Sequence, residues 1–438
     1  MAKKYIQWLY EELPSLVDKG VLTPESAQKL RTHYGVVKAR SGFQLALIIS
    51  SVLGALLIGL GIILLFAHNW EDLSRPTRTV LSLAPLIIGQ LLAGSTIWRK
   101  SDSVAWREGS STFLMIAIGA AIALISQTYQ IPGDMTDFLL TWILLGIPLV
   151  YLMNATVPVL IYFVLLTLWA GNSAVSGENV LLYWPLVALV IPYLRKLLKV
   201  DRYDLHPMLI LWGLSLSLCW ATGVTLGNAA PGLWVINYSS LFALMYLIGT
   251  RWFDENARIV KNPLQAVGTI GLLVIAYILS YRPPWEEIGS SHYWQELHLS
   301  RFEFAADVIM TAAFFVTVLY MLIRLRLYRG YKGLYMMIPV PAIIAFILNN
   351  QGSPIMIPVI IFNLYLIALG VVTLSAGLKE ENLETVNLGM LILLVVIVSR
   401  FFDLEFSFLT RGIAFIVCGA GFLLTNLVLL RRKKGGAQ

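Results

Sequence analysis

The chain has 438 residues, of which 58% are hydrophobic and only 13% are charged, and its mean hydropathy is +0.75. Soluble domains carry about 25% charged residues, so this composition excludes a water-soluble globular protein and predicts a lipid bilayer as the surroundings. The net charge of +7 would suggest nucleic acid beside a soluble protein. Basic residues gather in the cytoplasmic loops of membrane proteins, however, so we expect no nucleic-acid partner.

Cysteine usage and catalytic motifs are equally restrictive. Cys219 and Cys418 both lie inside apolar runs, where they offer neither a metal-ligand spacing nor a disulfide framework. The chain contains no Walker loop, dinucleotide GxGxxG, HExxH or GxSxG pattern. We therefore expect no metal and no cofactor, and no residue can be named as catalytic.

The first part of the chain, residues 1–42, is predicted to form a cytoplasmic helical hairpin. Apolar residues from Tyr5 to Val17 follow helical spacing, and Gly20 suits a helix C-terminus. Thr23 can cap a second helix that has Pro24 in its first turn. Two helices this short bury little surface, so we expect the hairpin either to dock on the rest of the chain or to recruit a protein partner.

Continuous apolar runs follow up to residue 430. A transmembrane helix needs about 20 mostly apolar residues, and only helices or closed barrels can satisfy their backbone within lipid. The fold class is therefore expected to be all-α: a polytopic transmembrane helical bundle over 43–430, of about 14 helices, followed by a basic cytoplasmic tail at 431–438. The predicted spans are 43–67, 79–97, 111–127, 137–153, 156–171, 180–194, 207–226, 232–250, 264–281, 304–323, 333–349, 354–377, 383–400 and 411–430.

The orientation follows from the positions of Lys and Arg. With the N-terminus in the cytoplasm, the alternation of these spans places 26 Lys and Arg inside and six outside. This asymmetry is what the positive-inside rule predicts, and it puts both termini in the cytoplasm. Since the first 30 residues hold no short apolar run, Phe43 to Ala67 is expected to act as an uncleaved signal anchor.

Several segments of the first third resemble a known family. They are GVLTPESAQKLRTHY (Gly20 to Tyr34), GALLIGLGIILLFAHNWEDLSRPTR (Gly54 to Arg78), WREGSSTFL (Trp106 to Leu114) and QTYQIPGD (Gln127 to Asp134). The resemblance is to a bacterial family of predicted integral membrane proteins of unknown function. It implies a multi-pass protein of the bacterial cytoplasmic (inner) membrane, and it implies no activity.

Polar residues near the membrane midplane are uncharged. The central spans contain no Asp, Glu, Lys, Arg or His at that depth, which argues against a buried carboxylate relay. The uncharged polar groups there are expected to make interhelical hydrogen bonds more often than ligand contacts. They are Gln90, Asn237, Tyr238, Asn363 and Asn387.

Charged residues gather instead in the predicted outer loops. If the first two outer loops converge, they form a polar mouth that could bind a sugar or a lipid headgroup, or carry acid–base chemistry. The substrate-binding residues predicted for this mouth are His68, Asn69, Trp70, Glu71, Asp72, Arg75, Gln127, Tyr129, Gln130 and Asp134. The alternative is that these are ordinary solvated charges beside interfacial aromatic anchors.

Two further outer loops also carry charge. The longest is expected to run from Arg282 to Asp307 and to lie on the membrane surface as an amphipathic segment. Its His292 and His298, with Glu286, match no standard metal-ligand spacing. The last outer loop is expected to hold Arg400, Asp403 and Glu405.

Three functions remain open from the sequence. The first is a transporter or flippase-like carrier of a neutral or lipid-like substrate, since many carriers are helical bundles with little buried charge. The second is a scaffold or accessory subunit that recruits a partner through the hairpin. The third is a membrane-embedded enzyme with an acid–base site at the outer face, formed by residues such as His68, Glu71, Asp72, Asp134 and Glu286.

Overall fold

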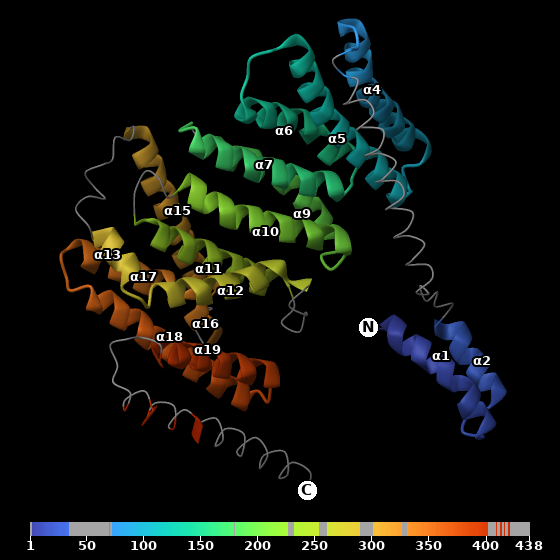
Figure 1. Cartoon of the computed structure of the whole chain (residues 1–438). Coiled ribbons are helices and arrows are strands. Elements are labelled where there is room, and N and C mark those ends of the chain that lie inside the picture. The colour runs from blue at the N-terminus through green and yellow to red at the C-terminus, as the bar shows by residue number, and fades with distance from the viewer. Residues whose placement is uncertain are drawn as a thin grey trace. The chain divides into compact units, whose positions relative to one another are not determined.

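The computed structural model describes most of the chain as helices. The described residues are 2–34, 70, 72–178, 180–226, 232–253, 261–289, 301–325, 331–401, 409, 412, 413, 416, 419 and 420. Among them the secondary structure is helical and contains no strand, which confirms the all-α fold class. The chain divides into two compact units, Met1–Arg78 and Thr79–Gln438, and each is considered by itself (Figure 1).

The first unit contains the predicted hairpin. Helix α1 spans Ala2–Asp18 and α2 spans Pro24–Tyr34. Gly20 between them adopts a left-handed φ of 67°, and the backbone N–H of Ser26 donates to the Thr23 hydroxyl oxygen over 3.3 Å, so both predicted helix boundaries are confirmed. Leu13 of α1 and Ala27 of α2 are buried, as their shared apolar stripe requires.

The first half of the second unit contains a helix at each predicted span. Its first helix extends back to Arg75, and the helix expected from 111 begins at Val104, seven residues before its predicted start. Its helices are α4 (Arg75–Arg99), α5 (Val104–Tyr129), α6 (Met135–Leu152), α7 (Val157–Val175), η1 (Val180–Leu182), α8 (Tyr183–Ala188), α9 (Ile191–Val200) and α10 (Leu205–Thr225). The span expected at 180–194 is present but differs in two respects: it runs to Val200, and it is interrupted between α8 and α9.

The second half of the unit begins with α11. Its helices are α11 (Trp234–Trp252), α12 (Pro263–Ile278), α13 (Pro283–Gly289), α15 (Arg301–Leu325), α16 (Tyr331–Met336), α17 (Pro339–Asn350), α18 (Met356–Lys379) and α19 (Leu383–Phe401). The span expected at 333–349 is likewise divided, into α16 and α17. The first and last predicted spans, 43–67 and 411–430, lie outside the continuously described residues.

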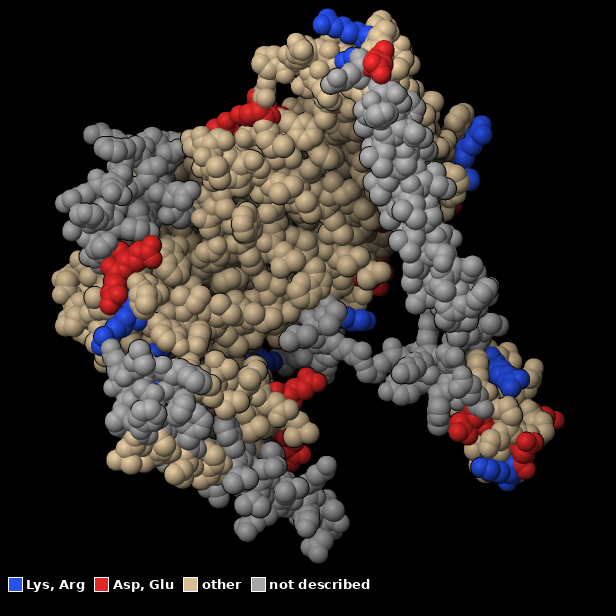
Figure 2. Space-filling model, viewed as in Figure 1, with Lys and Arg blue, Asp and Glu red and all other residues tan. Residues whose placement is uncertain are grey.

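Ten of the described segments are long and apolar enough to cross a membrane, and α12 is a shorter apolar helix. Helix α11 is not among the ten, in keeping with its polar residues Asn237, Ser239 and Ser240. The visible face of Thr79–Gln438 is uncharged over its middle, with Lys, Arg, Asp and Glu near its margins (Figure 2). The protein is therefore a multi-pass membrane protein.

Glycines allow two helical hairpins of this unit to pack at backbone distance. A Cβ on Gly268 of α12 would lie 2.6 Å from the backbone nitrogen of Tyr246 in α11. A Cβ on Gly389 of α19 would lie 2.5 Å from the backbone nitrogen of Leu374 in α18. Only glycine permits such an approach without displacing the neighbouring backbone.

Contacts between helices define the two ends of the bundle. Helices α7 and α10 run parallel, because Thr167 contacts Ser217 and Gly171 faces Trp220 further along both helices. Helices α7 and α10 therefore finish at the same end, where η1 and α11 begin. The positive-inside count predicts that this end faces the outside, and we call it the outer end.

Candidate functional site

The first interruption lies near the middle of the Val180–Val200 span. Pro192 has no N–H to donate to the preceding turn, and the N–H of Val190 bonds the carbonyl of Val187, three residues back, over 3.2 Å. Tyrosines of neighbouring helices bond the carbonyls of this break. The Tyr162 hydroxyl of α7 donates to Leu186 O over 2.9 Å, and the Tyr151 hydroxyl of α6 donates to Leu189 O.

The second interruption repeats this arrangement in α16–α17. Pro339 and Pro341 follow the interruption. The N–H of Met337 is shared between the carbonyls of Gly333, four residues back at 3.1 Å, and Leu334, three residues back at 3.2 Å. The hydroxyl of Tyr365, from α18, also donates to Leu334 O. In each broken helix, therefore, a tyrosine from a packed neighbour bonds a backbone carbonyl beside the interruption.

Each broken helix also carries a tyrosine that bonds a hydroxyl of the next long helix. Tyr183 of α8 lies 2.8 Å from the Ser217 hydroxyl of α10, which is itself 2.7 Å from Thr167 of α7. Tyr335 of α16 lies 3.1 Å from the Thr373 hydroxyl of α18. Both tyrosines are almost fully buried.

These two sites offer backbone dipoles and hydroxyl groups within otherwise apolar spans. Irregular backbone is tolerated at membrane depth only where protein or a water-lined cavity surrounds it. The backbone at Leu189, Val190 and Ile338 keeps right-handed helical angles, so each interruption is a kink and not an unwound segment. Interrupted helices carry the substrate sites of many secondary transporters. The groups present are uncharged, so they suit a neutral ligand and a hinge motion rather than ion capture.

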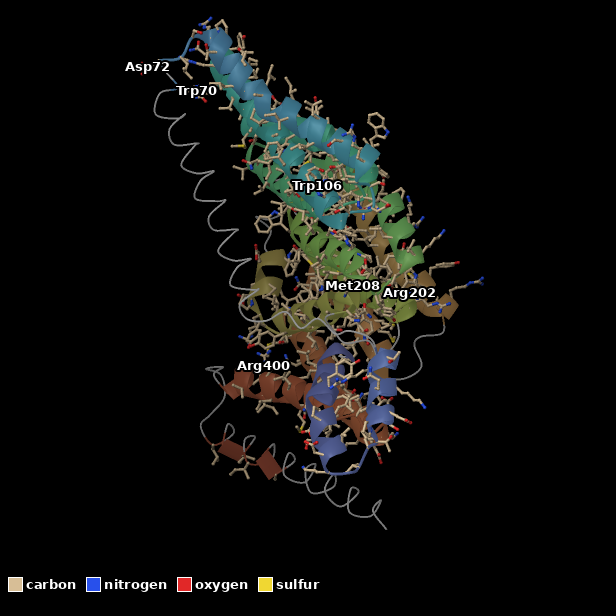
Figure 3. The ribbon with its side chains drawn as sticks, turned by 90° about the vertical axis from the view of Figure 1, so that its right-hand side faces the viewer. Trp70, Asp72, Trp106, Arg202, Met208 and Arg400 are labelled. Carbon is tan, nitrogen blue, oxygen red and sulfur yellow. The ribbon has the colours of Figure 1, made fainter. Side chains whose placement is uncertain are left out.

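The outer end of the second half is held by an arginine that sequence reasoning placed wrongly. Arg400 was expected in a loop but lies in the last turn of α19 (Figure 3). Its Nε donates to Asn363 Oδ1 over 3.0 Å and its guanidinium to Ser280 Oγ over 2.8 Å, and it stacks 4.2 Å from the Tyr281 ring centroid. Helices α12, α18 and α19 are thereby joined.

Two more bonds complete this region. The Trp285 indole donates to Leu279 O over 2.8 Å, and the Asn349 amide donates to Trp285 O over 3.1 Å. We call this set, with Ser280, Asn363 and Arg400, the Arg400 clasp. The interhelical role predicted for Asn363 is confirmed, since its amide also donates to Ser280 O over 3.0 Å.

A carboxylate–histidine pair at the opposite, inner end of the bundle was also not predicted from the sequence. Glu108 of α5 accepts from the backbone N–H groups of Thr156 and Val157 over 2.7 and 2.9 Å, so it occupies the positive N-terminus of α7. His206 lies 3.5 Å from the Glu108 carboxylate and bonds the Thr156 hydroxyl. Sequence reasoning had no signal for this, because Glu108 and His206 are far apart in the chain.

The predicted outer mouth is only partly visible. Trp70 and Asp72 lie just before α4, whose first residue is Arg75 (Figure 3), whereas His68, Asn69 and Glu71 lie outside the described residues. Gln127 and Tyr129 end α5, and Gln130 is its left-handed C-cap with a φ of 50°. The mouth as a whole stays a prediction.

Two residues of the predicted outer mouth, Tyr129 and Asp134, make hydrogen bonds within the bundle. The Tyr129 hydroxyl lies 2.9 Å from the Thr79 hydroxyl, which joins the end of α5 to α4. Asp134 caps α6 by accepting the N–H of Asp137 over 2.8 Å. One oxygen of this carboxylate therefore has a structural role.

The long outer loop also needs one correction. Asp307 was expected in that loop, but it lies in α15 and is only 1% exposed. Seven residues later on the same face, Phe314 packs against Trp184 of α8, with ring centroids 5.6 Å apart. His292 and His298 lie outside the described residues, and the described part of the chain contains no group of metal-ligating side chains.

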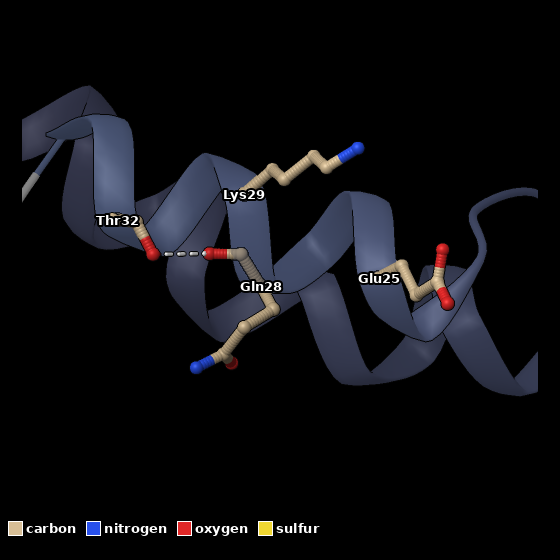
Figure 4. Close-up of a pocket in the computed structure, with 4 residues that line it drawn as sticks. All are labelled: Glu25, Gln28, Lys29 and Thr32. Atoms are coloured by element: carbon tan, nitrogen blue, oxygen red, sulfur yellow. Dashed lines mark hydrogen bonds between the residues drawn. The ribbon is translucent and has the colours of Figure 1, made fainter.

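A hollow lies on the exposed face of α2 in the hairpin. Glu25, Gln28, Lys29 and Thr32 line it, and the Thr32 hydroxyl bonds the Gln28 carbonyl over 2.9 Å (Figure 4). These residues recur at helical spacing and point into solvent. The hollow is therefore an ordinary hydrated helix face and supplies no convergent binding groups.

Comparisons with known proteins agree with the resemblance drawn from the sequence. Residues 14–159 match a family described as "Predicted membrane protein (DUF2157)", a stretch that runs from α1 into α7. No curated protein and no solved structure matches the chain. The family description names a membrane location and no activity, so any function has to be argued from the helices themselves.

Proposed function

We propose that this protein is a carrier, of the transporter or flippase type, for a neutral or lipid-like substrate. The observation that carries the proposal is a pair of proline-associated kinks, at Leu189–Val190 in the middle of one membrane span and at Met337–Ile338 in the first half of another. A proline leaves a backbone carbonyl of the preceding turn without its helical donor, at a depth where a carrier can hold its substrate. The tyrosines beside each break can release or re-form a hydrogen bond as the half-helices move.

The charge pattern supports a neutral substrate. The groups that bond each break are tyrosine, serine and threonine hydroxyls. Ion and proton carriers usually hold ionisable groups inside the membrane, paired or facing the pathway. Among the described residues, the ion pair of Glu108 with His206 lies at the inner end of the bundle, and the buried carboxylate of Asp307 lies in the first two turns of α15, near the end of that span.

Cysteine accessibility tests the carrier without knowledge of its substrate. Val190 is 3% exposed and lies at the first break, whereas neighbouring Leu189 is 44% exposed and is expected to face lipid. In a background with Cys219 and Cys418 replaced by alanine, Val190→Cys and Leu189→Cys would be treated with a membrane-impermeant thiol reagent. The reagent would be added to either side of oriented vesicles.

A carrier must open the middle of the bundle to both sides in turn. We therefore expect Val190→Cys to react from each side and Leu189→Cys to react from neither. A closed, solid bundle would protect Val190→Cys from both sides, and that result would remove the carrier proposal.

A second candidate, recruitment of a protein partner, is supported by the position of the hairpin in a compact unit, Met1–Arg78, that is separate from Thr79–Gln438. Val21, at its turn, is 66% exposed, and Leu13 is 1% exposed. A photo-crosslinking residue at position 21 would form a discrete protein adduct in cells if the hairpin recruits a partner, and one at position 13 would not. Equal, diffuse labelling at both positions would argue against recruitment.

A further inference from the structure

Buried polar atoms without a hydrogen-bond partner gather in one part of the bundle. Among the described residues eight side-chain nitrogen or oxygen atoms are in this state. Six of them lie on α7, α8, α10 and α11, and we call these six residues the unpaired layer. They are Trp169, Ser173, Trp184, Thr225, Asn237 and Ser240.

All six residues lie toward the outer end. Trp169 and Ser173 are in the last turns of α7, and Thr225 is the last residue of α10. Trp184 is the second residue of α8, which follows α7 after a short turn. Asn237 and Ser240 are in the first two turns of α11. Because α7 and α10 are parallel, the four helix ends share one level of the bundle.

Hydrogen bonds join α8 to α10 and α10 to α11 at or beside this level. At the end of α7, the Glu178 N–H bonds Ser173 O over 2.8 Å and closes the C-terminus of that helix. Tyr183 of α8 bonds Ser217 of α10. The Asn237 amide of α11 donates to Leu226 O, just after α10, over 3.3 Å, which leaves its Oδ1 without a partner.

On these four helices, the described buried polar atoms without a hydrogen-bond partner all lie at this level. Deeper in the bundle the hydroxyls of Thr167, Ser215 and Ser217 are all bonded, and so is that of Tyr162. Buried polar groups are normally satisfied by protein, by water or by ligand. Five residues of the unpaired layer are at most 5% exposed, so bulk solvent cannot serve them.

The chemistry of the unpaired atoms defines what they can bind. Two indole N–H groups donate, three hydroxyls donate or accept, and one amide oxygen accepts. None carries a charge. A set of uncharged donors and acceptors that includes two indoles suits a group with several neutral hydroxyls, whereas an ion would need an opposite charge.

We infer that the unpaired layer is the outer binding site for a neutral polyhydroxylated group, either a free sugar or polyol or the sugar headgroup of a lipid. This inference rests on the proposed carrier function and names its substrate class. Ordered water fills the same hydrogen-bonding positions when the site holds no sugar.

The test uses the full chain in nanodiscs of phosphatidylcholine, which contains no sugar. One arm adds free maltose, and the other includes diglucosyl diacylglycerol in the nanodisc. A ligand that binds only the folded protein raises the midpoint of thermal unfolding. A rise with maltose assigns a free sugar, and a rise with the glycolipid alone assigns a lipid headgroup. No rise in either arm, up to the solubility limit of each probe, overturns the inference.

Two alanine variants place the ligand. In Ser173→Ala and Ser240→Ala the helices stay intact, because neither hydroxyl has a protein partner. We expect each variant to unfold at the ligand-free midpoint of the parent and to bind the effective probe about three- to tenfold more weakly, the value of one lost hydrogen bond.

Ser215→Ala is the control, since that hydroxyl bonds Leu211 O over 2.7 Å and lies deeper in α10. It should keep the parent's affinity for the probe. Unchanged affinity in both layer variants would place the ligand elsewhere and overturn the assignment. Accessibility of Val190→Cys from both sides with no sugar binding would refute this site and leave the carrier proposal standing.

Discussion

The unpaired layer and the Arg400 clasp lie at the same end of the same bundle but satisfy their polar groups differently. In the clasp, the amide and indole groups of Asn363, Asn349 and Trp285 donate to protein acceptors, and one guanidinium joins α12, α18 and α19. In the unpaired layer, six polar atoms of four helices have no protein partner. Both regions adjoin well-packed apolar clusters, so poor packing does not explain the contrast.

The difference separates a structural role from a binding role. Polar groups that bond one another within lipid fix the distance between helices, and breaking such a network costs free energy at once. Polar groups that face no protein partner contribute nothing to the fold, and they are retained at low cost only if water or a ligand completes them. The clasp is therefore expected to be sensitive to mutation in stability, and the unpaired layer in binding.

The largest expected effect is at the centre of the clasp. Arg400→Met keeps the length of the side chain but removes its bonds to Asn363 and Ser280. Hydrogen bonds to a charged group contribute about 1.5–3 kcal/mol each. We expect the free energy of unfolding to fall by about 2–4 kcal/mol, measured by denaturant titration in mixed micelles.

Arg282→Met is the matched control for that variant. Arg282 is exposed, and its guanidinium contacts the sulfur of Met356 at 3.1–3.2 Å. We expect a loss below about 0.5 kcal/mol. If the two arginine variants were equally stable, the clasp would not be the structural contact described above.

The second effect compares glycines of the two regions. A Cβ on Gly389, in the hairpin that carries the clasp, would lie 2.5 Å from Leu374 N and 3.0 Å from Gly370 O. Gly389→Ala should therefore lower the free energy of unfolding by about 1–3 kcal/mol through overpacking. A Cβ on Gly171 of α7 would meet only Trp220 Nε1 at 3.7 Å.

Gly171→Ala should accordingly be neutral, or stabilising by up to about 1 kcal/mol through helix propensity. Thermal unfolding of the purified variants would rank them. If Gly171→Ala were destabilised, the helices beside the unpaired layer would be packed as tightly as those of the clasp. That result would contradict the proposed difference between the two regions.

A third, smaller effect probes the two interruptions. Tyr162→Phe and Tyr365→Phe each remove a hydroxyl that bonds a carbonyl of a broken helix. Each should cost about 0.5–1.5 kcal/mol of unfolding free energy, whereas Tyr320→Phe, at a side chain 63% exposed, should cost nothing measurable. If both breaks depend on their tyrosines, the two substitutions should also change the reactivity of Val190→Cys or of its counterpart Ile338→Cys.

The helices were predictable from the sequence because apolar length and proline or glycine punctuation are local signals. The boundaries of α10, α18 and α19 differ from those expected by two residues or fewer, and the Thr23 cap formed as predicted. The interruptions were not predicted. Proline within a span is tolerated, so its presence alone does not say whether the helix bends or divides.

The unpaired layer and the Arg400 clasp could not be predicted from the sequence, for a different reason. Whether Asn237 or Asn363 has all its partners depends on which helix faces it, and that contact joins residues as far apart as Ser280 and Arg400. A side chain such as Ser173 looks the same in the sequence whether it is bonded or not. The predicted outer-loop residues His68 and His292 lie outside the described residues.

The last comparison, between two serines, is the most decisive test of the contrast between bonded and unpaired polar groups. Ser217→Ala removes bonds to Tyr183 and Thr167 and should lower the free energy of unfolding by about 1 kcal/mol, with some extra loss because two partners are left unsatisfied. Ser173→Ala removes a hydroxyl with no protein partner, so without ligand its free energy of unfolding should stay within about 0.5 kcal/mol of the parent or rise. Denaturant titration of both variants, in sugar-free micelles, measures the difference. A loss at Ser173 as large as that at Ser217 would mean that Ser173 has a structural partner in the membrane, and the unpaired layer would then be part of the fold rather than a place for a ligand.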